Sequence, residues 1–204
     1  TTLFRSFSGG DFTVETGASI LDVPAQSPIV PGASSLTVED GAVLSHTANG
    51  STHDYSLLLD VGGDMTVHNG GEISAEGRGY SGGGNGSVGK GPGGGSGHGS
   101  YSGGGGGYGG IGGSGYSSTA GGQSYGSITQ PSQPGSGGGG GQYCSGSRGG
   151  GVIEISVGGI LTNSGLIRAS GADRASCNSA DEGGAGSGGS IILFAGELAG
   201  EGTI

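Results

Sequence analysis

The sequence predicts an all-β fold: a right-handed, three-sided parallel β-helix (a solenoid) that carries an inserted, polyglycine II-like bundle. Three observations predict it. Glycine accounts for 58 of the 204 residues, far above the usual ~7%. Short β-branched and apolar runs with period-two alternation flank a glycine-rich stretch on both sides. These runs recur in a unit of about 20 residues, and so short a unit buries its apolar face only by stacking on the next copy.

The first 78 residues are predicted to form the N-terminal turns of the β-helix (1–78). The clearest repeat spans residues 57–76, where Gly62-Gly63 and Gly70-Gly71 separate three short apolar runs. Strands of about five residues divided by glycine pairs are typical of one turn with three faces. Less regular copies precede it, at residues 3–23 and 35–45.

Residues 152–204 repeat the pattern and are predicted to form the C-terminal turns, interrupted by a second glycine-rich loop at residues 171–190. Alternate residues of each strand face the core. The expected core positions are therefore Leu58, Met65, Ile73, Ile153, Ile155, Leu161, Ile167, Ile192 and Phe194.

Residues 79–151 form the glycine-rich insertion, with blocks such as Gly103–Gly107 and Gly137–Gly141. One interpretation is a bundle of extended threefold helices whose amides bond between neighbours, because only glycine allows so close an approach. The other is a flexible Gly/Ser coil. A structureless loop of this length is rare in a compact protein, which favours the ordered bundle.

The two cysteines, Cys144 and Cys177, lie in the two glycine-rich segments. Each segment leaves just after a predicted third strand, so both insertions are expected on one face and side by side. We therefore expect a Cys144–Cys177 disulfide and an oxidising compartment. Two free thiols are the alternative.

Charge and hydropathy exclude several classes of function. The formal net charge is −10 with only six Lys and Arg residues, so the sequence offers no basic patch for nucleic acid. No apolar run approaches the ~20 residues of a membrane span. With no Trp and four Phe, we expect backbone hydrogen bonds and repetition, rather than a large side-chain core, to supply stability.

The two ends of the chain bear on assembly. The chain starts at Thr1 and stops at Ile204 within an expected strand. An open solenoid end is a free sheet edge, which natural proteins normally cap. We therefore expect either a fragment or a subunit completed by another copy, and end-to-end contacts that do not close form filaments. The expected stacking edge consists of Leu3, Phe4, Thr203 and Ile204.

The run Gly183–Leu193 followed by Gly200–Ile204 resembles the glycine-rich β-helix repeats of very large secreted and cell-surface fibre proteins. This resemblance covers the C-terminal third well and the N-terminal third loosely. The glycine blocks are similar to the polyglycine sandwiches of phage tail-fibre adhesins and of a small insect antifreeze protein. These resemblances imply an extracellular filament, an adhesive tip and an ice surface, respectively.

Catalytic and cofactor patterns are incomplete. Gly84–Lys90 matches the start of a phosphate-binding loop, but Gly91 stands where Ser or Thr should hold magnesium. We therefore expect no catalytic residue, no cofactor-binding residue, no metal ligand and no enzyme activity. The carboxylates of one repeat look like exposed strand positions rather than a pair facing each other across a cleft: Asp60, Asp64, Glu72 and Glu76.

Calcium is the open alternative among cofactors, because Asp173, Asp181 and Glu182 share a loop and carry oxygen ligands. The nonapeptide of calcium-binding β-rolls is missing, so a solvated acidic loop is the preferred interpretation. The four histidines show no spacing typical of metal ligands.

Four residues are candidate glycosylation sites. Asn49 and Asn85 begin sequons, and Thr129 and Ser132 lie in a Pro-containing segment that could accept O-glycans. In a secreted eukaryotic protein the sequons could carry glycan, whereas in a bacterial or phage protein they would be coincidence.

Tyrosines gather in and beside the glycine-rich insertion. They either pack over the glycine segments as the only large surfaces there, which we prefer, or stack on sugar rings. The candidate ligand-contact residues are Tyr101, Tyr108 and Tyr116.

The sequence thus predicts a structural subunit or repeat of an extracellular or cell-surface filament, glycosylated and stacked end to end through open β-helix edges. Its expected partners are copies of itself and glycans. The alternative is an adhesin tip that presents glycine-region loops to a receptor or glycan. Ice binding needs a flat array of small residues and is disfavoured by the charged outward positions. A polysaccharide-active enzyme is the fourth option.

Overall fold

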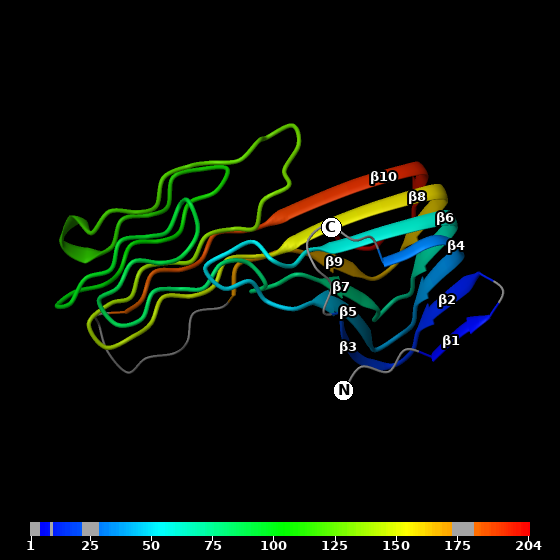
Figure 1. Cartoon of the computed structure of the whole chain (residues 1–204), viewed down its shortest axis with the longest axis horizontal. Coiled ribbons are helices and arrows are strands. Elements are labelled where there is room, and N and C mark those ends of the chain that lie inside the picture. The colour runs from blue at the N-terminus through cyan, green and yellow to red at the C-terminus, as the bar shows by residue number, and fades with distance from the viewer. Residues whose placement is uncertain (1–4, 9, 22–28, 173–181) are drawn as a thin grey trace.

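The computed structural model describes residues 5–8, 10–21, 29–172 and 182–204. The strands gather at one end of the molecule, and the glycine-rich segments extend away from them at the other end (Figure 1). Helix is almost absent: the described residues contain one 3-10 turn, η1 (Tyr116–Ser118).

The strands within the described ranges form two sheets. Pairing is parallel throughout, except between the first two strands of the larger sheet, which are antiparallel. The six-stranded sheet has the order β1 (Arg5–Ser8), β2 (Asp11–Val14), β4 (Ile29–Val38), β6 (Leu57–Val67), β8 (Val152–Asn163) and β10 (Ser190–Ala199). The four-stranded sheet has the order β3 (Gly17–Leu21), β5 (Ala42–His46), β7 (Glu72–Ser74) and β9 (Leu166–Arg168).

The predicted three-sided parallel β-helix is wrong. The chain forms a mixed, mostly parallel fold of two sheets, and no closed solenoid occurs within the described residues. The difference lies at Gly62-Gly63 and Gly158-Gly159, which the sequence predicts to separate two faces. Each pair instead lies inside one long strand, β6 or β8. Because neither pair has the positive φ of a turn, the pairing of β6 with β8 resumes beyond them in the same sheet.

At two of the sheet changes, a glycine with a positive φ follows an acidic or amide residue. Asp40-Gly41 (φ 71°) joins β4 to β5, and Asn69-Gly70 (φ 83°) joins β6 to β7. Residues with a Cβ rarely adopt this conformation, so glycine is required there. The two turns stack, since the Gly41 N–H donates to the Gly70 carbonyl at 3.1 Å.

The side-chain core lies between the two sheets, where equivalent inward residues form ladders across the strands. One ladder joins five strands of the larger sheet through Phe12, Leu36, Met65, Leu161 and Leu198. Its first four members are buried. Most of the expected core positions are confirmed as buried, namely Met65, Ile73, Ile153, Ile155, Leu161 and Ile167.

Three expected core positions differ. Leu58 and Ile192 are only half-buried, and Phe194 is exposed. Their strand neighbours face the core instead, with Leu57 and Leu59 buried and with Ile191 and Leu193 packed against the core. In a run of consecutive apolar residues the phase of the alternation is hidden, and a shift by one residue moves every side chain to the opposite face.

Residues 79–151, together with residues 182–189, form a second type of packing that we call the glycine array. Its extended segments bond to one another through the backbone. Within the central segment 135–141, successive N–H groups donate to different neighbours at 2.8–3.0 Å. The acceptor segments repeat every three residues. The N–H groups of Gly137 and Gly140 both donate to the segment 87–90, whereas the N–H groups of the two residues between them donate to two other segments. The donor–acceptor pairs are Gly137–Lys90, Gly138–Ser147, Gly139–Gly104 and Gly140–Ser87.

Glycine is required in the array because neighbouring backbones approach too closely for a side chain. A Cβ at Gly139 would overlap the Ser96 carbonyl, and one at Gly140 would overlap the Gly84 carbonyl. The second glycine-rich loop joins the same packing, since the Gly184 N–H donates to Gly139 O at 2.8 Å. The two insertions therefore lie side by side, as expected from the sequence. The predicted domain division into 1–78, 79–151 and 152–204 stays a prediction.

Candidate functional site

The outer edges of β9 and β10 form the end of both sheets, which we call the open end. Within the described part of the chain, no strand pairs with the outer edge of β10. The outer edge of β9 carries one bridge, from Leu166 to Thr203. There the Ile167 N–H donates to Thr203 O at 3.0 Å, and the Thr203 N–H donates to Gly165 O at 2.9 Å. Thr203 thus forms a single parallel bridge to β9.

The apolar core is exposed to solvent at the open end. Leu161 of β8 and Leu198 of β10 are register partners on the same inward face. Leu161 is 0% exposed, whereas Leu198 is 57% exposed. Leu193 shows the same loss of burial, because it is half-buried whereas its register partner Ile155 is fully buried. The inward face of β10 therefore presents apolar side chains without an opposing strand.

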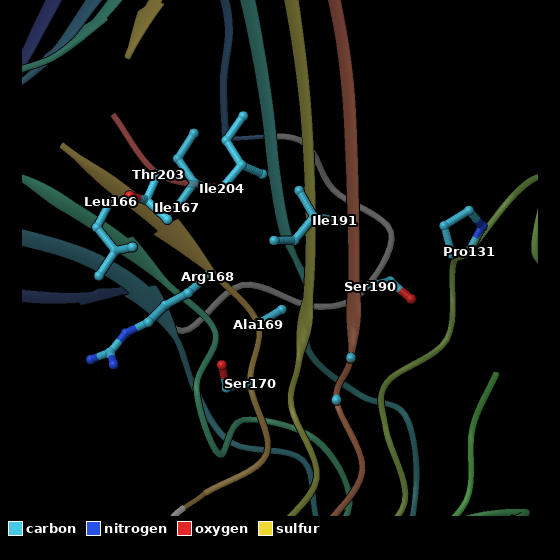
Figure 2. A pocket seen from close by; sticks show the side chains of 12 residues that line it. Pro131, Leu166, Ile167, Arg168, Ala169, Ser170, Ser190, Ile191, Thr203 and Ile204 are labelled. Carbon is cyan, nitrogen blue, oxygen red and sulfur yellow. The ribbon is translucent and has the colours of Figure 1, made fainter. Parts of the chain in front are cut away.

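A pocket of about 780 Å3 lies between the two sheets at this end. Figure 2 shows Ile167 and Ile204 on one side of it and Ile191 on another, with Ser190 and Pro131 at the far side. The Arg168 guanidinium points away from Ile191 (Figure 2) and binds Glu72 Oε1 and Glu76 Oε2, both at 2.7 Å. The walls are mainly aliphatic, so the pocket is suited to burying apolar side chains.

Two residues of the expected stacking edge lie at this pocket. Thr203 and Ile204 both line it, next to β9. The other two, Leu3 and Phe4, lie outside the described residues. The open end therefore contains Thr203 and Ile204, the C-terminal half of the expected stacking edge. It also contains Ile191 and Leu198, which the sequence does not identify as edge residues.

The two candidate N-glycosylation residues have opposite environments. The Asn49 side chain is buried, and its Nδ2 donates to Tyr55 O and Arg78 O at 2.9 and 3.0 Å. A glycan there would have to replace both hydrogen bonds, which counts against Asn49. Asn85 is exposed in a turn closed by Ser87 N–H to Gly84 O at 2.8 Å.

The candidate O-glycosylation residues Thr129 and Ser132 are both exposed. They lie in the segment between Tyr125 and Pro134, beside Pro131 of the pocket. Glycosylation of Thr129, Ser132 and Asn85 stays a prediction.

The three candidate ligand-contact tyrosines separate into two groups. Tyr101 and Tyr116 form one exposed cluster with His98. Tyr108 is instead partly buried against the ring of Tyr125, with ring centroids 5.0 Å apart. Its hydroxyl lies 2.6 Å from Ser190 Oγ, so Tyr108 packs the glycine array against the start of β10.

Cys144 is buried within the glycine array. Cys177 lies outside the described residues, as do the candidate calcium ligands Asp173 and Asp181. Both the disulfide and the calcium alternative therefore stay predictions. Within the described ranges, no group of three or more His, Cys, Asp or Glu side chains is arranged to hold a metal ion.

Three of the four carboxylates considered for catalysis, Asp64, Glu72 and Glu76, have structural partners. Glu72 and Glu76 both bind Arg168. Asp64 Oδ1 accepts the Ile160 N–H at 2.8 Å, next to the glycine pair of β8. These contacts tie neighbouring strands together.

The junction between the sheets and the array contains two residues that the sequence does not single out. The Arg148 guanidinium donates to the carbonyls of Asn49, Gly77 and Gly79 and to Ser81 Oγ. It therefore connects the loop after β5, the end of β7 and the array. No short motif indicates this role, because the partners are more than 60 residues away in sequence.

The second junction residue is His46, which is fully buried. Its Nδ1 lies 2.8 Å from Thr47 O and donates to it, because a carbonyl only accepts. Its Nε2 lies next to Gly151 and has no hydrogen-bond partner among the described residues. Burial, opposed in part by the Thr47 hydrogen bond, lowers the pKa of His46 to about 4, and the positive charge of Arg78 acts in the same direction as burial.

Two further observations bear on function. No helix in the described part of the chain has the length and apolar character needed to cross a membrane. Comparison with protein-family models, with curated proteins and with solved structures found no match.

Proposed function

We propose that the protein is a structural subunit of an extracellular or cell-surface filament in which copies stack end to end. The observation that carries the proposal is the uncovered core at the open end. Leu198 has the same inward position as the buried Leu161 and is nevertheless 57% exposed. The proposed role is mechanical and needs no catalytic residue.

A second copy is the proposed occupant of this end. The larger sheet grows from β2 to β10 by repeated parallel addition of strands whose inward side chains align. A strand from another copy would bond to the free backbone edge of β10 and cover Leu198 and Ile191. Edge-to-edge addition between unlike ends is a heterologous contact, and such contacts give a filament when the rotation between successive copies does not close a ring.

Charge sets the expected conditions of assembly. Each copy has a net charge of −10, so copies repel one another at low ionic strength. Salt screens this repulsion while leaving apolar burial intact. We expect assembly to increase as sodium chloride is raised from about 10 to about 150 mM, over which the Debye length falls from ~30 to ~8 Å.

Electron microscopy of the protein isolated from its source is the direct test. We expect filaments with an axial repeat that corresponds to one stacked subunit. Discrete particles at all protein and salt concentrations would contradict the proposal.

Two matched variants test the open end as the contact. Leu198→Lys places a charge on the inward face of β10, whereas Phe194→Lys makes the same kind of change at an equally exposed residue on the other face, 58% against 57%. Both side chains are solvent-accessible in the single copy, so both variants should fold. We expect Leu198→Lys to abolish filaments and Phe194→Lys to retain them. Equal behaviour of the two variants would reject the inward face of β10 as the interface.

A further inference from the structure

A cluster of three rings lies on the surface of the glycine array. The ring centroids of Tyr101 and Tyr116 are 5.4 Å apart with an interplanar angle of 60°, and those of His98 and Tyr101 are 4.9 Å apart. Tyr116 is 69% exposed and Tyr101 is 39% exposed. We call His98, Tyr101 and Tyr116 the tip cluster, because η1, which begins at Tyr116, lies at the end of the array farthest from the sheets (Figure 1).

The backbone holds these rings in place. Ser117 and Ser118 both have positive φ, at 57° and 61°, a conformation that is uncommon for residues with a side chain. The turn is closed by the Gly115 N–H to Thr119 O at 2.8 Å and by Thr119 Oγ1, which donates to Tyr116 O at 2.9 Å. Strained backbone of this kind tends to occur at functional sites. Here it forms the turn that begins at Tyr116.

His98 is anchored in the same way. Its N–H donates to Gly140 O at 2.9 Å, in the central segment of the array. Its Nδ1 accepts the Ser100 N–H at 3.1 Å, which fixes the ring orientation. The hydrogen bonds of His98 and the contacts between the rings restrict the cluster, which lowers the entropic cost of ordering it on ligand binding.

The chain segment that carries the cluster is uncharged, and an acidic residue packs beside it, since the Gly103 N–H donates to Glu182 O at 2.9 Å. Residues 91–147 contain no Asp, Glu, Lys or Arg, in a chain whose net charge is −10. A ligand recognised mainly through its charge, such as nucleic acid or an anionic polysaccharide, would need opposite charges that this segment lacks. Serine, tyrosine and backbone groups remain as hydrogen-bonding partners.

We propose that the tip cluster is a binding platform for a neutral oligosaccharide. The apolar C–H face of a pyranose ring packs against an exposed aromatic ring, and its hydroxyl groups bond to nearby serine hydroxyls and peptide groups. Rigid tyrosines set among serine and glycine combine contact area with adaptable hydrogen bonding, as they do in antibody binding loops. A specific protein partner would need an interface of about 800 Å2 on this side, whereas three rings match one or two sugar residues. The platform is independent of the open end.

Titration of the full chain with cellohexaose and with chitohexaose tests the proposal. The chain has seven Tyr and no Trp, so tyrosine fluorescence reports on the rings directly, and calorimetry supplies the affinity. We expect at least one of the two oligosaccharides to bind and Tyr116→Ala to weaken it about tenfold or more, equivalent to about 1.4 kcal/mol. Tyr116→Phe should bind almost as the parent does, because it keeps the ring.

The control variant is Tyr143→Ala, which removes a tyrosine that is 63% exposed and lies outside the cluster. It should leave the affinity unchanged. The proposal is overturned if neither oligosaccharide binds at millimolar concentration, or if Tyr101→Ala and Tyr116→Ala bind as tightly as the parent chain. Tighter binding of oligogalacturonate, which is anionic, would overturn it as well.

Discussion

The two-sheet region and the glycine array are both built from extended, hydrogen-bonded chain, but they fill their interiors differently. Between the sheets, ladders of aliphatic side chains such as Leu36, Met65 and Leu161 make a core that is almost fully buried. In the array, the interior consists of backbone. Glycine brings neighbouring segments so close that a Cβ at Gly139 would overlap a carbonyl.

This difference shows which interactions stabilise each region. Burial of an aliphatic side chain contributes about 1.5–3 kcal/mol, whereas a backbone hydrogen bond contributes about 0.5–1.5 kcal/mol net. Glycine also loses more conformational entropy on ordering than other residues do. The array meets the sheets at the junction residues Arg148 and His46. The four predictions below test this comparison.

Removal of a buried aliphatic side chain should have the largest effect. Leu161→Ala is expected to lower the free energy of unfolding by about 2–5 kcal/mol, because it leaves a cavity between the sheets. Leu198→Ala, at the same inward position of the next strand, should cost less than about 1 kcal/mol in the single copy, since its side chain is already exposed. Urea denaturation monitored by circular dichroism measures both. Similar losses would show that β10 is covered in solution.

Acid should weaken the junction between the two regions. The pKa of His46 is lowered to about 4 in the folded chain from its ordinary value of 6.5. The unfolded state therefore takes up a proton near pH 6.5 and the folded state only near pH 4. This group's contribution is complete above pH 6.5 and is lost as the pH falls towards 4, by about 3 kcal/mol in total.

The variant His46→Leu tests this contribution. It should be less stable than the parent at pH 7, because it loses the hydrogen bond to Thr47, but it should show a flatter decline between pH 6.5 and 4. The matched change at exposed His68, His68→Leu, should keep the parent's decline. Denaturation midpoints at half-unit pH intervals provide the comparison. An unchanged slope in His46→Leu would assign the acid sensitivity to other groups.

Addition of one methyl group to the array should destabilise it, although the same change is harmless at an open position. Gly139→Ala forces the Ser96 carbonyl away and should cost about 1–3 kcal/mol. Gly109→Ala has no atom within 4 Å of the added Cβ, so it should be neutral or stabilising by up to about 1 kcal/mol. The thermal unfolding midpoints of the two variants measure this difference in stability. Equal tolerance would mean that the array is not tightly packed in solution.

Loss of the ion pairs on the surface of the sheets should lower the free energy of unfolding least. Arg168→Met removes the ion pairs with Glu72 and Glu76, which are partly exposed. The expected loss is about 0.5–1 kcal/mol at low salt. It should shrink in about 1 M sodium chloride, where the Debye length is ~3 Å. A large loss that does not depend on salt would point to packing by the arginine stem instead.

Much of the local structure was predictable from the sequence. Period-two alternation identified the segments of β6, β8 and β9 and most of their inward residues, including Met65, Ile155 and Ile167. The alternation failed where several apolar residues follow one another, as at Leu57-Leu58-Leu59, because either phase satisfies the pattern. The alternation failed again at Gly62-Gly63, because a glycine pair is compatible both with a turn between two strands and with extended backbone inside one strand.

The candidate sites show the same limit. Asn49 and Asn85 have identical sequons, yet one side chain is buried in four hydrogen bonds and the other is exposed in a turn. Tyr108 and Tyr116 have similar glycine-rich surroundings, but only Tyr116 is presented to solvent. Exposure depends on which distant segment packs nearby, and a motif carries no information about that.

By itself, the sequence determined the extended segments, the need for glycine in the insertion and the uncharged character of residues 91–147. These properties follow from each residue's own backbone freedom, volume and charge. Tertiary structure alone decided that there are two sheets, that the core is uncovered at Leu198, and that Arg148 and His46 lie at the junction. Each of these depends on hydrogen bonds and contacts between segments tens of residues apart, which form only when the whole chain has folded.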